Sequence, residues 1–128
     1  MTTRLKTIRL KTPRLRTHMT LRDQMRKGST EILLLALLAD EPMYGYQISQ
    51  ELAKRSGGYF DMKEGLLYPT LHRMQKDGLL TSEWRKAGAA RRRKYYAITA
   101  TGHEQLQSQS DEWQVFMQKL QEMIANQA

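Results

Sequence analysis

The 128-residue sequence contains no cysteine, three prolines, three histidines and two phenylalanines. Without cysteine, the chain has no disulfide framework and no thiolate ligands for a metal ion. Its longest wholly apolar run, residues 32–39, is eight residues long, whereas a membrane-spanning helix needs about 20. No signal-peptide pattern opens the sequence, so we expect a cytoplasmic protein without a membrane partner.

Patterns that indicate catalysis or cofactor binding are missing as well. His18, His72 and His103 fall in three separate segments, and the carboxylates are scattered. The sequence has no glycine-rich phosphate loop and no metal-ligand spacing. We therefore expect no enzyme, no catalytic residue, no metal ion and no cofactor. The length is that of a single domain with a modest core.

Positive charge is in excess, with 21 Lys and Arg against 13 Asp and Glu and a formal net charge of +8. Residues 1–28 hold nine Lys or Arg and the single acid Asp23, whereas residues 29–128 hold twelve of each sign. Nucleic-acid binding by the second part must therefore depend on local clusters. The densest cluster is RRRK at residues 91–94.

Residues 4–18 repeat a five-residue pattern, RLKTI, RLKTP and RLRTH. The repeat has no sustained helical or strand period, and it is too polar to bury a core. We predict a flexible basic arm over residues 1–28 that grips phosphates without sequence preference. The alternative is that this segment is dispensable and that the protein starts at Met19 or Met25.

Two helices are predicted after the arm. The first begins near Ser29, which with Thr30 is a candidate N-cap, and it ends before Pro42. Because its run ILLLALLA is apolar on every side, it must be covered all round, by its own domain or by a second subunit. The second helix runs from about residue 45 to residue 55 and is closed by two glycines.

Residues 64–80 predict a third helix with one buried stripe and one outward face. Leu67, Leu71 and Met74 recur at the spacing of a single apolar stripe. The other faces carry hydrogen-bond donors suited to phosphates and base edges. These donors are Tyr68, Thr70, His72, Arg73 and Lys76. The alternative is an ordinary amphipathic helix whose polar face is only solvated.

Pro69 limits where this helix begins, because proline lacks an N–H and crowds the carbonyl four residues earlier. A start near Leu66 or Leu67 places Pro69 in the first turn, where it is tolerated. Asp77-Gly78 then predicts the end of the helix.

After Leu80 the pattern changes to the alternation of a strand, and residues 94–99 are rich in Tyr and Ile. Between them lies a glycine-containing turn at residues 86–90, so we predict a β-hairpin. Its flank and tip carry Arg85, Lys86, Arg91, Arg92, Arg93 and Lys94. Three helices followed by a basic hairpin make a winged helix-turn-helix, here predicted for residues 29–100. The alternative for the basic tip is a solvated turn.

The last predicted element is a long helix over residues 101–128. Thr101 and Glu104 fit a capping box, although Thr99 competes as the cap. Apolar side chains recur at intervals of seven and indicate a dimerisation helix. We assign dimerisation to Leu106, Trp113, Leu120 and Ile124. The alternative is that the helix folds back on its own core. The predicted fold class is thus mainly α with a small β-hairpin, plus a long C-terminal dimerisation helix.

Several motifs occur together in one order. They are Tyr44-Gly45-Tyr46, Glu64-Gly65-Leu66-Leu67-Tyr68-Pro69, Leu71-His72-Arg73-Met74, Asp77-Gly78-Leu79 and Arg92-Arg93-Lys94-Tyr95-Tyr96. From about Arg26 to its end, the chain resembles the PadR family of bacterial transcriptional regulators, in the subgroup with a short C-terminal helix. The resemblance implies a homodimeric repressor that binds an inverted repeat in double-stranded DNA and is often released by a small aromatic compound. The arm before Thr20 departs from the family pattern, as does Leu66, where Thr or Ser is more frequent.

The resemblance also implies DNA-binding residues. These are Tyr68, Pro69, Thr70 and Arg73 on the third helix and Arg91, Arg92, Arg93 and Lys94 on the wing, to which the outward face adds Lys76. Tyr44 and Tyr46 are left open between packing and phosphate contact.

Trp113, with Phe116 and Met117 one turn away, is a candidate effector site. Two such indoles near a dimer axis leave a flat slot suited to a planar aromatic compound. The alternative is that Trp113 only fills the core.

Two rival functions remain open. One is a nucleic-acid-binding protein without sequence preference that uses the basic arm. The other is a protein-binding adaptor built on the winged-helix scaffold, since a fold does not fix a function.

Overall fold

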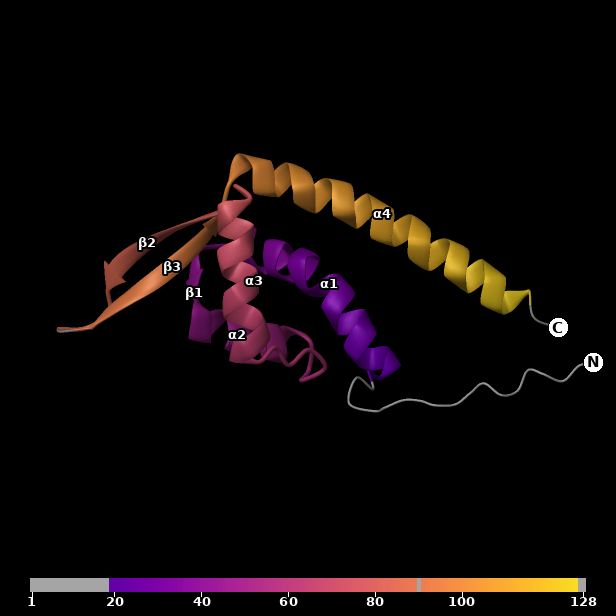
Figure 1. The fold of residues 1–128 in the computed structure, drawn as a ribbon, viewed down its shortest axis with the longest axis horizontal. Helices are drawn as coiled ribbons and strands as arrows, with labels where there is room; N and C mark the ends of the chain where they lie inside the picture. The colour runs from indigo at the N-terminus through magenta and orange to yellow at the C-terminus, as the bar shows by residue number, and fades with distance from the viewer. Residues whose placement is uncertain (1–18, 90, 127–128) are drawn as a thin grey trace, which may run out of the picture.

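The computed structural model describes residues 19–89 and 91–126. The helices are α1 (Leu21–Leu38), α2 (Gly45–Arg55), α3 (Glu64–Lys76) and α4 (Ala100–Ala125), and the strands are β1 (Met43–Tyr44), β2 (Leu80–Lys86) and β3 (Arg92–Ile98). The hairpin of β2 and β3 extends from one side of the helical body, and α4 runs away from it on the other side (Figure 1). This is the predicted winged helix-turn-helix with a C-terminal helix. The repeat at residues 4–18 lies outside the described residues.

The sheet has the strand order β1-β3-β2, and both pairings are antiparallel. In the hairpin, Leu80 pairs with Ile98 and Lys86 pairs with Arg92. The two-residue strand β1 was not predicted, because two residues are too few to show an alternating pattern. Its Met43 pairs with Tyr96 and so ties the hairpin to the start of α2.

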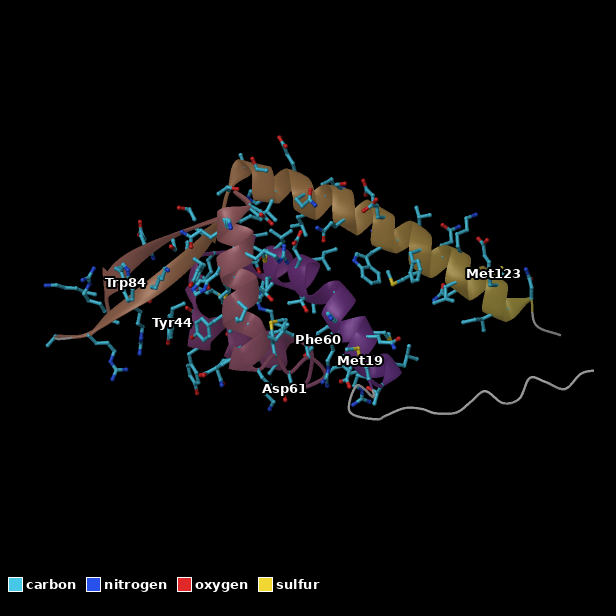
Figure 2. All side chains as sticks on the ribbon, viewed as in Figure 1. Met19, Tyr44, Phe60, Asp61, Trp84 and Met123 are labelled. Carbon is cyan, nitrogen blue, oxygen red and sulfur yellow. The ribbon has the colours of Figure 1, made fainter. Side chains whose placement is uncertain are left out.

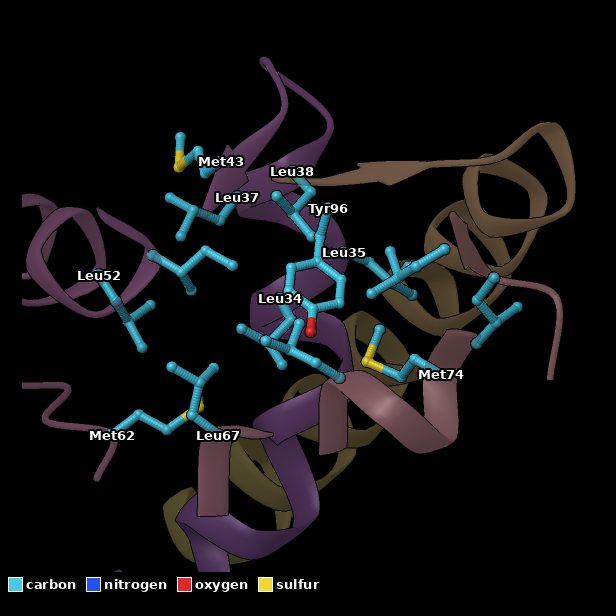
Figure 3. Packing of buried hydrophobic residues seen from close by; sticks show 14 residues of the cluster. Leu34, Leu35, Leu37, Leu38, Met43, Leu52, Met62, Leu67, Met74 and Tyr96 are labelled. Carbon is cyan, nitrogen blue, oxygen red and sulfur yellow. The ribbon is translucent and has the colours of Figure 1, made fainter. Parts of the chain in front are cut away.

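The core lies where α1, α2, α3 and the sheet meet (Figure 3). Leu34 and Leu35 of α1 are fully buried, and they surround Tyr96 of β3 together with residues of α2 and α3. The apolar run of α1 is therefore covered largely by its own domain. The predicted α3 stripe of Leu67, Leu71 and Met74 is buried as expected.

The predicted start of the first helix near Ser29 is wrong. Thr20 is the N-cap of α1, and its side chain and that of Asp23 form a reciprocal capping box. The Ser29 hydroxyl instead donates to the Met25 carbonyl inside the helix (2.8 Å). Helix α1 thus includes residues 21–28, which were assigned to the arm, because the capping box provides hydrogen-bond partners at an earlier start.

The predicted boundaries of the other helices also need correction. Helix α3 begins at Glu64, so Pro69 lies inside it and not in its first turn. The backbone N–H groups of Leu66 and Leu67 donate to the Lys63 carbonyl, which fixes this earlier start. Thr99, and not Thr101, caps α4, and its hydroxyl accepts from the backbone N–H of Gly102 (3.0 Å).

The base of α4 is attached to the segment that follows α3. The Thr99 hydroxyl lies 2.7 Å from the Gly78 carbonyl and 3.0 Å from the Leu79 carbonyl, to which it donates. A Cβ added to Gly102 would lie 2.3 Å from the Leu79 carbonyl oxygen, so only glycine allows this approach. Among the described residues, no helix has both the length and the apolarity needed to cross a membrane.

Candidate nucleic-acid interface

A groove of about 790 Å³ runs between α3, the start of α2 and the hairpin. It is lined by Tyr44, Gly45, Tyr46, Tyr68, His72, Trp84, Arg91, Arg92, Arg93, Lys94 and Tyr96. Trp84 lies on the hairpin, and Tyr44 of β1 lies beside the middle of the hairpin, where it pairs with Tyr95 (Figure 2). The structure thus brings the predicted wing residues beside Tyr68 of α3.

Aromatic rings hold the cations of this groove in place. The guanidinium of Arg93 lies 4.3 Å from the ring centroid of Tyr44, and that of Arg92 lies 5.4 Å from the ring of Trp84. Arg85, on the same hairpin but outside the groove lining, lies 4.6 Å from the Tyr95 ring and is also paired with Glu83, whose Oε2 is 2.7 Å from its Nε. Such contacts orient a cation without neutralising it. The wing therefore presents pre-positioned positive charge, as phosphate binding requires.

The outward face of α3 is formed by Pro69, His72 and Lys76, which are exposed and lie three or four residues apart. Tyr68 is half-buried at the edge of this face. Its hydroxyl group packs on Gly45, where an added Cβ would clash with it. Pro69 and Lys76 are thus exposed on the outward face, together with His72, and their contact with DNA stays a prediction.

Thr70 was predicted to lie on the outward face, and this position is wrong. Thr70 is 8% exposed, and its hydroxyl donates to the Leu66 carbonyl at 2.7 Å. The physical reason is that Thr70 lies one turn from Leu66 and Arg73 on the flank of α3 that faces α1 and α4. Its hydroxyl is therefore occupied within the helix.

Arg73 lies on the same flank as Thr70. Its Nη1 is 2.9 Å from Oε1 of Glu31 in α1 and 3.3 Å from Oδ2 of Asp77. The structure does not bring Arg73 into the groove with the wing cations. Its role in DNA binding, predicted from the resemblance, stays a prediction.

Six groove residues were not assigned as DNA-binding residues from the sequence: Tyr44, Gly45, Tyr46, His72, Trp84 and Tyr96. Tyr44 and Tyr46 had been left open, and the contact of Tyr44 with Arg93 gives it a place in the groove. His72 was named among the outward donors of the helix but was not assigned as a DNA-binding residue; it lies four residues after Tyr68 and therefore on the same helical face. Trp84 was placed on a strand by the alternation after Leu80, but no role was predicted for it, and it is 57% exposed.

Tyr96 forms the floor of the groove and is 2% exposed. Burial raises the pKa of its phenol above the ordinary value, and the neighbouring Tyr68 adds to this shift. The phenol therefore stays neutral at pH values where an exposed tyrosine begins to ionise.

A second cavity, of about 770 Å³, lies between α1, α3 and α4. Its lining includes Trp113 and Phe116, whose rings meet edge to face at a centroid distance of 5.8 Å. Met117, the third residue of the predicted effector site, is not part of this lining. Leu106 is partly buried against the core of its own domain, because the first turns of α4 lie over that core, and its role in dimerisation stays a prediction. No cluster of three metal-ligating side chains occurs within residues 19–89 and 91–126.

Comparisons with known proteins bear on the family and the fold of the chain. Residues 34–108 match the family described as Transcriptional regulator PadR-like family. The chain is 35% identical over 77 residues to Transcriptional regulator Rv3488 of Mycobacterium tuberculosis, covering 60% of this chain and 69% of that protein. It is similar to the crystal structure of a PadR family transcriptional regulator from Eggerthella lenta, with 31% identity, a TM-score of 0.72, and coverage of 80% of this chain and 88% of that one.

The chain is also similar in fold to Bacillus subtilis PadR, whose crystal structure is a complex with operator DNA. The TM-score is 0.57 at 24% identity, and the match covers 62% of this chain and 45% of that one.

Proposed function

The chain belongs to the PadR-like family of transcriptional regulators, and on that basis we propose that it is a homodimeric repressor that binds an inverted-repeat operator and is released by a planar aromatic effector. The observation that carries the proposal is the groove between α3 and the hairpin, with its row of wing cations. The outward face of α3 enters the major groove, and the wing lies along the phosphates. The complex of Bacillus subtilis PadR with operator DNA supports this docking by likeness of fold.

Within this proposal the residues on α3 and the residues on the wing have different roles in DNA binding. Pro69, His72 and Lys76 face the base edges from α3, with Tyr68 at the boundary of the groove. The cations of the wing, Arg91, Arg92, Arg93 and Lys94, bind phosphates. Phosphate contacts supply affinity and orientation, whereas base contacts supply sequence preference.

Exposed apolar side chains on the second half of α4 support dimerisation. They are Val115, Phe116, Met117, Leu120, Met123 and Ile124. This half of α4 extends beyond the helical body (Figure 1), so its apolar side chains need a partner to cover them. A second copy offers the same surface and pairs with it about a two-fold axis. Two α3 helices then reach half-sites about 34 Å apart.

The cavity beside Trp113 is the proposed effector site. Its volume of about 770 Å³ lies within the range of small-molecule sites, roughly 300–1,000 Å³. Trp113 and Phe116 offer ring faces for stacking, and Leu66 and Thr70 of α3 form part of the same lining. An effector bound here touches the recognition helix directly, and it weakens operator binding if it prefers the DNA-free conformation.

Selection of bound sites from random DNA duplexes by the purified protein tests the proposal. We expect a palindromic consensus whose half-sites are about one helical turn apart. Recovery of sequences without a consensus would favour the rival function, a nucleic-acid-binding protein without sequence preference. We place a regulator of this kind in the cytoplasm, where bacterial DNA lies.

A further inference from the structure

Glu31 of α1 joins the recognition helix to α4. Its Oε1 forms the 2.9 Å ion pair with Nη1 of Arg73 in α3, while its Oε2 accepts a hydrogen bond from Nε2 of Gln109 in α4. The Glu31 side chain is 19% exposed and that of Arg73 is 52% exposed, so the ion pair is only partly shielded from solvent. The Glu31 carboxylate of α1 thus contacts both α3, through Arg73, and α4, through Gln109.

This link is the second attachment of α4 to the recognition helix region. The first is at Thr99, whose hydroxyl donates to the Gly78 and Leu79 carbonyls just after α3. Gln109 lies ten residues further along, about 15 Å at 1.5 Å per residue. Between these two points Leu106 packs against the core, and the two polar attachments add to that contact in fixing the direction of the helix.

Arg73 contacts two carboxylates within the protein through the same nitrogen, while its side chain is 52% exposed. Besides Glu31, its Nη1 contacts Oδ2 of Asp77 at 3.3 Å, so two carboxylates face one guanidinium. A DNA phosphate would have to compete with both of them. Arg73 also lies on the flank of α3 that lines the α4 cavity and not the wing groove.

We propose that Glu31 is a positioning residue for operator recognition, which sets the angle between α3 and α4 by holding Arg73 and Gln109, and that Arg73 acts through Glu31 and not on DNA. The inference rests on the proposed DNA-binding function. In the proposed dimer, the angle between α3 and α4 determines how far apart the two recognition helices lie. Glu31 therefore governs binding to two correctly spaced half-sites, and it does not govern binding to arbitrary DNA.

The substitution Glu31→Gln tests the proposal, because the expected weakening of operator binding is opposite to the effect of removing a negative charge alone. Removing a carboxylate from a DNA-binding protein normally strengthens binding to any duplex. If Glu31 positions the helices, Glu31→Gln weakens binding to the selected operator roughly 2- to 30-fold, the range found along coupling networks. Binding to a scrambled duplex of the same length does not weaken, which separates a positioning role from partial unfolding.

Glu51→Gln is the matched control. Glu51 also pairs with an arginine that contacts a second carboxylate, since Arg55 bonds both Glu51 and Asp40. That cluster does not include α3 or α4, so Glu51→Gln should leave operator binding within twofold of wild type, a margin smaller than the coupling effect. Gln109→Ala provides an independent variant that breaks the link from α4, and it should weaken operator binding as Glu31→Gln does.

Combining Glu31→Gln with Arg73→Gln completes the test. If Arg73 acts through Glu31, the double variant binds the operator as tightly as whichever single variant binds it less tightly. The salt dependence of operator binding is then the same as in wild type.

The proposal is overturned if Glu31→Gln and Gln109→Ala bind the operator as tightly as wild type. A salt slope lowered by about 0.9 in Arg73→Gln also overturns it, because this is the value for one lost phosphate contact. If wild type itself selects no operator, the proposed function fails, and this outcome is seen independently of the variants.

Discussion

Tyr68 of α3 lies so close to Gly45 of α2 that no side chain fits between them. A Cβ built on Gly45 would be 2.2 Å from Oη of Tyr68 and 2.6 Å from its Cζ. Gly45 is the first residue of α2 and is buried. The two helices of the helix-turn-helix are thus packed through a glycine and a tyrosine, and this contact fixes the position of α3 relative to α2.

Gly45→Ala should therefore destabilise the fold. Overpacking of this kind costs about 1–3 kcal/mol, because the Tyr68 ring has to move from its place at the edge of the groove. Urea unfolding followed by circular dichroism measures the change. Gly28→Ala is the control, since nothing lies within 4 Å of a Cβ there, and in the interior of α1 alanine should stabilise by about 0.5–1 kcal/mol. Equal stability of Gly45→Ala and wild type would contradict the close packing.

Replacing Arg91, Arg92 and Arg93 together by Ala should flatten the salt dependence of operator binding. The logarithm of the binding constant falls with the logarithm of salt concentration by about 0.9 for each phosphate neutralised. Titrations at several salt concentrations measure this slope. Lys119→Ala on α4 is the control, because that lysine is exposed far along α4 and pairs with Glu122. An unchanged slope in the triple variant would place the wing away from DNA.

Leu120→Asp should convert the proposed dimer into monomers. Leu120 is 47% exposed in a single chain, and a charge at this position would be buried at high cost in the dimer interface. Sedimentation velocity measures the oligomeric state, and operator binding should be lost together with the dimer. Gln121→Asp is a control at a polar position next to it. A Leu120→Asp protein that sediments as a wild-type dimer would refute the assignment of this residue.

Planar aromatic compounds should quench the fluorescence of Trp113 and weaken operator binding over the same concentration range. The titration uses wild type, Trp113→Phe and Trp84→Phe, because these two tryptophans are the only ones in the sequence. Quenching should persist in Trp84→Phe and disappear in Trp113→Phe, since Trp113 lines the cavity and Trp84 lies in the wing groove. Compounds that quench Trp113 without changing operator affinity would show that the cavity is not regulatory.

The free energy of unfolding should decrease as the pH rises above about 10, in part because of Tyr96. Its pKa is raised in the folded protein, so the folded state retains the proton while the unfolded state begins to lose it. The stability associated with the neutral phenol is thus fully present below the ordinary pKa and is lost as the pH passes through the raised value. Urea unfolding between pH 8 and pH 11 should show a shallower decline in Tyr96→Phe. The exposed Tyr46→Phe serves as the control, and equal slopes in both variants would exclude Tyr96 as the cause.

The order of the elements and the core could be predicted from the sequence because both follow from local patterns. The stripe of Leu67, Leu71 and Met74 indicated which side of α3 is buried, and the structure agrees. The early start of α1 was also visible in the local sequence, as Thr20 followed three residues later by Asp23. The helix was nevertheless predicted to begin near Ser29, just after the glycine at position 28. Such an error arises because glycine only weakens a helix and does not end it.

The assignment of the two flanks of α3 could not be made from periodicity. A buried stripe leaves two flanks, and the sequence alone does not tell which of them a later helix covers. Thr70 and Arg73 face α4 because Glu31 and Gln109, 78 residues apart, meet beside them. A contact at that separation depends on the path of the whole chain. For the same reason, Tyr44 and Arg93 could not be recognised as partners before β1 was seen to pair with β3.

Helix α4 is held at its base by Thr99 and Gly102 and again at Gln109, so a rearrangement at either attachment turns the whole helix as a lever arm. Its 26 residues extend about 39 Å at 1.5 Å per residue. A rotation of only about 3° at the base displaces the far end by roughly 2 Å over that length. If two copies are joined near the far ends, a side-chain rearrangement too small to disturb the core is enlarged into a change in the separation of the two recognition helices. DNA has a fixed helical repeat, so a change of that size alters whether both half-sites can be reached at once.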